Sequence, residues 1–293
     1  MRLSSVELNV LHPKAAHAFM METWGMADAP SGAHEECLYL RGSSELPYLV
    51  ALRPSETPSV ASLTFLCEPG EVAALSERAM QHGAKVQKVA SDDLGGGEGV
   101  LVQGPEGEVF RFLEGVAMAQ PITGRDLPVK LTHVVFNATD AEATADFVEA
   151  ALGFKVSDRT KGMVFVRCNR SHHSIAFARA GFASLNHIAF EMQDMDAVMR
   201  GIGRMRDVGA APAWGPGRHG PGANVFAYFI APFGPVIEFS TAVDIVGDDY
   251  KVGAPEDWTW PEKRIDQWGL SDKDVKALGE AERRFKFATD AFA

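Results

Sequence analysis

The stretch LTHVVFNATDAEATADFVEAALGF, residues 131–154, joins a short apolar strand to a turn and to a helix that ends at a glycine. The stretch LSSVELNVLHPKAAHAFMMETWGM, which begins at Leu3, repeats this order of strand, turn, helix and glycine. Apolar residues recur at helical spacing in both copies, and the glycine suits the left-handed residue after a last helical turn. A unit that occurs twice in one chain indicates a duplicated fold.

The similarity between the two copies continues beyond this unit. In each copy a further strand precedes an amphipathic helix, closed by Gly83 or Gly209, and a later Pro-x-Gly turn leads into another strand. The matching segments are VASLTFLCE (60–68) with SLNHIAFEM (184–192) and GPEGEVFRF (104–112) with APFGPVIEF (231–239). We therefore expect an α+β fold of two tandem domains, each built from two units of a strand, a helix and several strands.

The repeat also predicts the boundaries of the domains and of a tail. We expect a metal-free N-terminal domain over 1–120, a linker around 115–128, a metal-binding domain over 128–243 and a C-terminal tail over 244–293. In the tail we expect a helix capped by Ser271, with Val275, Leu278 and Ala281 on one face. The tail could cover the second domain, join a subunit interface or extend into solvent.

Composition excludes several classes of function. The 293 residues include 28 basic and 39 acidic residues, a formal charge of −11, and such a surface would repel nucleic acid. No apolar run approaches the roughly 18 residues that cross a membrane, and the N-terminus does not resemble a signal peptide. The three cysteines are widely spaced, which is typical of reduced thiols. We therefore expect a cytoplasmic protein with no nucleic-acid or membrane partner.

Three candidate metal ligands lie at equivalent points of three strands in the second domain. They are His133 in LTHVVF, His187 in LNHIAFE and Glu238 in PVIEFST. Two histidines and one carboxylate form the ligand set of a mononuclear non-haem iron(II) centre with open coordination positions. Alternation puts each candidate opposite bulky residues that a helix could cover. A single mid-strand histidine is more often structural, but three ligands at repeated points favour a metal site.

The first domain carries different residues at these points. The repeat aligns His133 with Ser5, His187 with about Ser62, and Glu238 with Arg111. An arginine would repel a divalent cation. We therefore expect one metal ion per chain, held by the second domain, and a structural role for the first domain.

Residues 128–242 resemble the catalytic domain of type I extradiol dioxygenases in the vicinal oxygen chelate superfamily. The motifs LTHVVF, RCNRSHHSIAF, LNHIAFE, GPGRHGPGANVFAYF and PFGPVIEF follow in the order and spacing of that family. The resemblance implies tandem domains, each an open cup-shaped barrel of two βαβββ modules. It also implies cleavage of a catechol-type substrate by O2 next to its paired hydroxyls, with a muconic semialdehyde-type product. The cofactor would be Fe(II) or, less often, Mn(II).

The resemblance further implies roles for individual residues. His133, His187 and Glu238 would hold the metal, His173 would be the acid–base catalyst, and His219 and Tyr228 would be catalytic residues that also bind the diol. By strand alternation His173 would share a face with Ile175 and Phe177, and His172 would point away from the metal. Trp214 and Phe226 could form an aromatic substrate pocket or be ordinary packing. Many relatives have a histidine at Asn186, and biphenyl-type relatives have an asparagine at Pro221, so the substrate stays undetermined.

Other functions remain open at this point. A glyoxalase-like isomerase or lyase takes metal ligands from both halves of its site, which Ser5, Ser62 and Arg111 disfavour. A non-catalytic small-molecule-binding protein of the same fold generally lacks metal ligands. A keto-acid dioxygenase of the hydroxyphenylpyruvate type is usually longer and lacks the SHHSIAF and GRH motifs. The resemblance favours a dioxygenase of aromatic hydrocarbon catabolism that forms a homo-oligomer.

Overall fold

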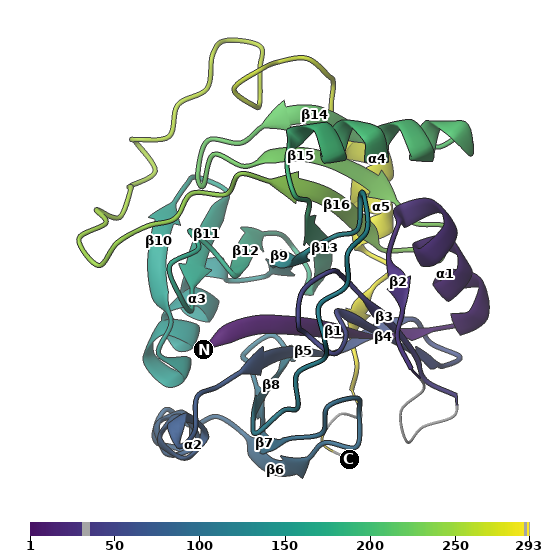
Figure 1. Cartoon of the computed structure of the whole chain (residues 1–293). Coiled ribbons are helices and arrows are strands. Elements are labelled where there is room, and N and C mark those ends of the chain that lie inside the picture. Colours follow the sequence, from purple (N-terminus) through teal and green to yellow (C-terminus); the bar gives the residue numbers. More distant parts are fainter. Residues whose placement is uncertain (31–35, 290–291, 293) are drawn as a thin grey trace.

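The computed structural model describes residues 1–30, 36–289 and 292, and two mixed β-sheets form its framework (Figure 1). The N-terminal sheet has the strand order β2-β3-β4-β1-β5-β8-β7-β6. Its strands are β1 (Arg2–Val10), β2 (Ala27–Asp28), β3 (Leu38–Arg41), β4 (Val50–Pro54), β5 (Ser59–Leu66), β6 (Val86–Ala90), β7 (Glu98–Gln103) and β8 (Val109–Glu114).

The C-terminal sheet has the order β10-β11-β12-β9-β13-β16-β15-β14. Its strands are β9 (Lys130–Ala138), β10 (Lys155–Arg159), β11 (Met163–Arg167), β12 (Ile175–Arg179), β13 (Ser184–Glu191), β14 (Trp214–Arg218), β15 (Val225–Ile230) and β16 (Val236–Thr241). This order equals that of the N-terminal sheet with every strand number raised by eight. Each sheet stays open, because its two end strands do not pair with each other in the described part of the chain. The predicted α+β duplication is confirmed.

The helices repeat in the same way. The first pair is α1 (Pro13–Phe19), which continues as the π-helical turn η1 (Met20–Trp24), and α3 (Ala141–Leu152). The second pair is α2 (Glu71–Gln81) and α4 (Met195–Asp207). Gly25 and Gly153 follow the first pair with φ of 96° and 77°, a left-handed conformation that glycine adopts without strain. No helix in the described ranges is long and apolar enough to span a membrane.

The two halves share one continuous hydrophobic core. Trp24 of η1 stacks on Phe239 of β16, with ring centroids 3.6 Å apart and an interplanar angle of 6°. Phe65 of β5 packs edge-on against Phe154, at 5.1 Å. The bulky faces of the strands that carry the candidate ligands therefore pack into this core, as alternation predicted. The domain boundary near residue 120 stays a prediction.

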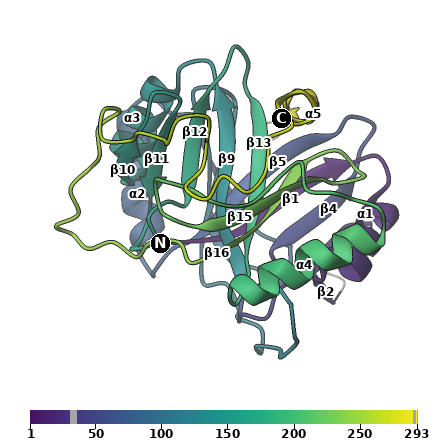
Figure 2. The same ribbon diagram turned by 90° about the horizontal axis from the view of Figure 1, so that it is seen from above.

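The tail passes over the C-terminal sheet on the side of the candidate ligands and then returns to the N-terminal sheet (Figures 1 and 2). It contains α5 (Val275–Glu282) and β17 (Lys286–Phe287), which pairs with β5. The predicted Ser271 cap is wrong, because Asp274 caps α5 and Ser271 instead accepts a hydrogen bond from the Gly215 amide at 2.8 Å. Leu278 and Ala281 are buried as predicted.

The predicted apolar face of α5 is wrong at one position. Val275 is 69% exposed. The buried stripe of α5 therefore begins at Leu278, and it is shorter than the sequence suggested.

Candidate metal centre

Three adjacent strands bring the candidate ligands together. His133 lies on β9, His187 on β13 and Glu238 on β16, and all three are buried. Oε2 of Glu238 lies 3.3 Å from Nε2 of His133 and 3.1 Å from Nε2 of His187, and the two imidazole nitrogens are 3.3 Å apart. These atoms form a compact triangle, all within 4.8 Å of one another, and the three residues could therefore hold a metal ion.

The chemistry of this triangle fits a divalent cation. Nδ1 of His187 is 2.7 Å from Oδ1 of Asn186, so the ring nitrogen donates there and leaves a lone pair on Nε2. That lone pair and the Glu238 oxygen are both acceptors, and they repel each other unless a cation lies between them. Ligand atoms about 2.1 Å from a metal and about 90° apart are about 3.0 Å from each other, close to the observed spacing. The residues present therefore fit a metal.

The electrostatics favour the ligand protonation states that a metal requires. Burial alone would raise the pKa of Glu238, but His133 and His187 outweigh it and hold that pKa well below its ordinary value. Burial lowers the pKa of His187 although Glu238 opposes the shift. An ionised carboxylate and neutral imidazoles are the forms that coordinate divalent metals.

A chain of hydrogen-bonded amide side chains supports His187 through its Nδ1 atom. Sequence reasoning missed this chain. Nδ2 of Asn186 donates to Oδ1 of Asn137 at 2.8 Å, and Nδ2 of Asn137 donates to Oε2 of Glu282 in α5 at 3.4 Å. The β9–β13 register shifts between Leu185 and His187, which is typical of a bulge and allows consecutive side chains to line one cavity. On the other side of the triangle, Asn224 donates to Oε1 of Glu238 at 3.2 Å. Such partners orient metal ligands.

His173 lies beside His133, with ring centroids 4.2 Å apart, and lines the same cavity. The predicted strand face is wrong: Ile175 and Phe177 lie in the hydrophobic core, and Ala178 of β12 faces the cavity. Residues 171–174 precede the regular strand, so alternation cannot be extended back to His173. Burial lowers the pKa of His173 well below its ordinary value, and His133 adds to the shift.

His172 points away from the metal ligands, as predicted, and determines the tautomer of His173. Its Nε2 lies 2.5 Å from Oδ2 of Asp158, and its Nδ1 lies 3.0 Å from Nδ1 of His173. A carboxylate can only accept, so His172 donates to Asp158 and accepts from Nδ1 of His173. Nε2 of His173 then carries a free lone pair, and it has no hydrogen-bond partner among the residues that the structure describes.

His219 and Tyr228 meet at the opposite side of the cavity. Nε2 of His219 is 2.9 Å from the Tyr228 hydroxyl, which lies 3.5 Å from Nε2 of His187. Burial lowers the pKa of His219 to about 3, and burial together with Glu238 raises the pKa of Tyr228 well above its ordinary value. The predicted pocket residue Trp214 lines the cavity and stacks on Tyr228 at 5.3 Å.

Of the two alternatives for Phe226, substrate pocket or ordinary packing, the structure favours packing. Phe226 is fully buried, stacks on His219 with centroids 3.9 Å apart, and is not among the residues that line the cavity. Its position on β15 puts the ring behind His219, so Phe226 positions that imidazole. Strand alternation alone could not show which aromatic ring would line the cavity and which would pack behind His219.

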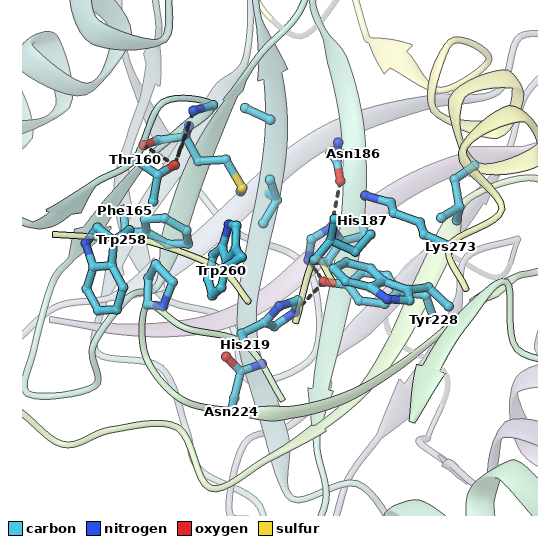
Figure 3. A pocket seen from close by; sticks show the side chains of 18 of the residues that line it. Thr160, Phe165, Asn186, His187, His219, Asn224, Tyr228, Trp258, Trp260 and Lys273 are labelled. Atoms are coloured by element: carbon cyan, nitrogen blue, oxygen red, sulfur yellow. Dashed lines mark hydrogen bonds between the residues drawn. The ribbon is translucent and has the colours of Figure 1, made fainter. Parts of the chain in front are cut away.

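The cavity has a volume of about 790 Å³, within the range of pockets for drug-sized ligands. The tail supplies much of its outer wall, through Trp258, Trp260 and Lys273 (Figure 3). Phe165 of β11 lies near Trp258 in this view, on the side away from Lys273. Of the three alternatives for the tail, the structure favours the one in which it covers the cavity. Sequence periodicity carried no signal for this.

The equivalent region of the N-terminal sheet holds a buried ion-pair network. The strand registers confirm the predicted alignment, because Ser5 pairs with Thr64 and Thr64 with Arg111, as His133 pairs with Ala189 and Ala189 with Glu238. In the network, Arg111 donates to Oδ2 of Asp93 at 2.5 Å and to the Tyr48 hydroxyl at 2.7 Å. Glu7 lies 3.8 Å from Arg111 and pairs with Arg53. A guanidinium therefore occupies the position where the C-terminal sheet has a metal ligand.

Comparison with known proteins agrees with this architecture. Residues 130–239 match the family described as the Glyoxalase/Bleomycin resistance protein/Dioxygenase superfamily. A crystal structure of the Mn(II)-bound glyoxalase from Novosphingobium aromaticivorans is 30% identical, with a TM-score of 0.85 over 94% of this chain and 93% of that chain.

Two curated relatives are similar over much of their length. Metapyrocatechase 2 of Cupriavidus necator is 27% identical over 244 residues, 73% of this chain and 73% of the relative. An iron-dependent extradiol dioxygenase of Rhodococcus jostii is 23% identical over 302 residues, 86% of this chain and 97% of the relative. The resemblance found in the sequence motifs therefore extends to whole proteins.

Proposed function

This chain belongs to the Glyoxalase/Bleomycin resistance protein/Dioxygenase superfamily, and we propose that it is an extradiol dioxygenase, which cleaves a catechol ring next to its paired hydroxyls. One observation carries the proposal. His173, His219 and Tyr228 line the same cavity as the candidate ligands His133 and His187. The two curated relatives, a metapyrocatechase and an extradiol dioxygenase, support the same reaction class.

We propose Fe(II) as the metal held by His133, His187 and Glu238. Two imidazoles and one carboxylate suit an iron(II) oxygenase, and one curated relative is named as iron-dependent. A bound divalent metal would lower the pKa of a diol hydroxyl and provide a route for electrons between the catechol and O2. Mn(II) is the alternative, since the similar glyoxalase structure contains that ion.

The chain's own residues would bind and orient the diol. The Tyr228 hydroxyl, hydrogen-bonded to His219, can donate to a substrate oxygen next to the triangle of ligands. Because both groups are buried and packed against aromatic rings, they hold that oxygen in one position. The aromatic rings of Phe165, Trp258 and Trp260 line the cavity and would cover the rest of the ligand.

His173 would move a proton during the reaction. Its Nε2 lone pair faces the cavity and can accept the proton of a diol hydroxyl, while Asp158 and His172 hold the ring in that tautomer. The proton returns to the product, and both atoms of O2 enter it as one carbon–carbon bond breaks. The reaction therefore needs no outside reductant.

Oxygen consumption tests the proposal directly. The protein would be loaded with Fe(II) under argon and mixed with catechol and 4-methylcatechol in an oxygen electrode. We expect one O2 consumed per catechol, a yellow ring-opened product, and both atoms of ¹⁸O2 in that product. Protein that contains stoichiometric iron but consumes no O2 with any catechol of a substituted panel would contradict the assignment.

A glyoxalase-type isomerase is the second candidate, because the Mn(II)-bound structure at 30% identity carries that name. The same protein preparation, loaded with Mn(II), would be tested under argon with the hemithioacetal of methylglyoxal and glutathione. Turnover without O2 would favour the isomerase. A non-catalytic binding protein would show neither reaction. A cytoplasmic location and a homo-oligomeric state stay predictions.

A further inference from the structure

Lys273 brings a positive charge from the tail into the wall of the cavity. It immediately precedes the Asp274 cap of α5, is partly buried, and lines the cavity together with Trp214 and Asn186. Its Nζ lies 4.5 Å from the centre of the Trp214 ring. Figure 3 shows the amino end pointing toward Asn186 and His187. The charge therefore faces the ligand space.

Within the described ranges of the chain, the ammonium group has no acidic partner in contact. Among the residues that the structure describes, no carboxylate oxygen lies within 4.0 Å of Lys273. Glu282 lines the same wall, but its Oε2 accepts a hydrogen bond from Asn137 at 3.4 Å. Burial lowers the pKa of Lys273, and Glu282 opposes that shift without pairing. A half-buried lysine without a contacting anion is uncommon, because losing water costs free energy that a partner normally offsets.

The rest of the cavity does not supply the missing anion. Two neutral imidazoles and Glu238 would leave a divalent metal with one positive charge, which a singly deprotonated diol neutralises. In the proposed function, His219 and Tyr228, which are hydrogen-bonded to each other, would bind the diol oxygens and leave Lys273 unused. The cavity of about 790 Å³ has room for a substituent beyond a single ring. A second negative group on the substrate would match Lys273 in charge and position.

We propose that Lys273 is a specificity-determining residue that binds a carboxylate on the substrate, so that the preferred substrate is a catechol with an anionic side chain. This proposal rests on the proposed function, in which the cavity binds a catechol. The carboxylate would accept a charge-assisted hydrogen bond from Nζ beside the Trp214 ring.

Two probes of equal size would test the role of the charge. They are 3,4-dihydroxyphenylacetate and its primary amide, compared by anaerobic binding to metal-loaded protein and by kcat/KM in air. We expect wild-type protein to bind the carboxylate more tightly. Lys273→Met should weaken binding of the carboxylate about tenfold to a hundredfold, mainly in KM, with a loss at least tenfold smaller for the amide. Lys273→Arg should restore much of the preference.

Lys276→Met is the matched control, because Lys276 lies three residues further along the tail, in α5, and is exposed. It should leave the preference between the probes unchanged. The proposal is overturned if wild-type protein binds both probes equally, or if Lys273→Met weakens both equally. Absence of ring cleavage with every catechol would contradict the proposed dioxygenase, whereas the anaerobic binding preference would still decide the role of Lys273.

Discussion

The two sheets share one strand order, but they hold opposite charges at one equivalent position and different polar groups at three others. The equivalent pairs are Ser5 and His133, Ser62 and His187, Arg111 and Glu238, and Tyr48 and His173. In the N-terminal sheet the cation is part of the chain, the guanidinium of Arg111, and carboxylates surround it. In the C-terminal sheet the chain supplies the anion, Glu238, and in the proposed function a bound metal would supply the cation.

This difference shows that the same strand positions can hold either a buried ion-pair network or a candidate metal site. The charges of the side chains at these positions determine which of the two forms. A carboxylate and two imidazoles with free lone pairs lack a cation until a metal binds. A buried arginine with Asp93 and Glu7 is already neutralised and satisfied. One half is therefore complete without a ligand, and the other is not. Exchanging residues between the halves separates these two states experimentally.

The largest effect is expected when a ligand is replaced by its counterpart from the N-terminal half. His187→Ser should abolish retention of the metal on desalting and all metal-dependent turnover, because a serine hydroxyl cannot replace an imidazole ligand at this position. The loss should exceed the tenfold to hundredfold typical of outer partners of metal ligands. Metal content by mass spectrometry and O2 consumption would measure it.

His12→Ser is a suitable control, because His12 is exposed and lies in the N-terminal half. It should retain wild-type metal content. If His187→Ser also bound one metal ion per chain with undiminished affinity, the assignment of His187 as a ligand would be wrong.

Removing the imidazole of His173 should separate binding from turnover. His173→Phe keeps an aromatic ring beside His133 but lacks the Nε2 lone pair. We expect metal content and anaerobic catechol binding close to wild type and a fall in kcat of about 10² to 10⁴. Tyr48, the counterpart of His173, already shows that this position accepts a ring without acid–base chemistry near neutral pH. Normal turnover by the variant would remove the proposed role.

In the N-terminal half the corresponding change should affect stability and leave the metal in place. Arg111→Met leaves the buried carboxylates of Asp93 and Glu7 with Arg53 as their remaining guanidinium, so one buried negative charge is no longer compensated. We expect a loss of about 3 to 5 kcal/mol in the free energy of unfolding at pH 7.5, measured by urea denaturation of metal-free protein. Metal affinity of the folded protein should be unchanged. A stable variant would show that the network contributes little.

The pH dependence of this loss has a predictable sign. Burial alone would raise the pKa of Asp93, but Arg111 outweighs it and holds that pKa below its ordinary value. In wild-type protein this contribution is present above the unfolded pKa of about 3.9 and is lost as pH falls through the folded value. Without Arg111, burial is opposed only by Tyr39 and Arg53, so the pKa of Asp93 should rise and protonation should relieve part of the uncompensated charge. The difference between variant and wild type should shrink as pH falls toward 4.

Much of this comparison could be predicted from the sequence, because the internal repeat aligns the strands of the two halves residue by residue. The repeat predicted that Ser5, Ser62 and Arg111 would occupy the ligand positions, and the registers agree. Prediction failed where local geometry departs from regularity. The segment before β12 is irregular, so the face of His173 could not be counted from Ile175. The tail contacts the cavity through residues from Trp258 onward, which lie outside every motif, so no spacing rule connects them to the site.

The bulge at Asn186 is another departure of this kind, and it offers the smallest and most selective test. The counterpart of Asn186 in the N-terminal half is Ala61, one residue before Ser62. Both halves retain the neighbouring pair, since Asn9 donates to Ser59 at 2.9 Å and Asn137 donates to Ser184 at 3.0 Å. The halves therefore differ here by the amide that accepts from His187.

Asn186→Ala should weaken metal binding about tenfold to a hundredfold and leave the fold intact. Without the acceptor, Nδ1 of His187 loses the partner that holds its tautomer and ring orientation, so some molecules present Nε2–H toward Glu238 instead of a lone pair. Competition with a chromophoric chelator for Mn(II) would measure the affinity independently of activity. Asn186→Asp retains an acceptor and should restore most of the loss, whereas Ala61→Asn should change nothing, because Ser62 offers no imidazole to orient. Unchanged affinity in Asn186→Ala would show that packing alone positions His187.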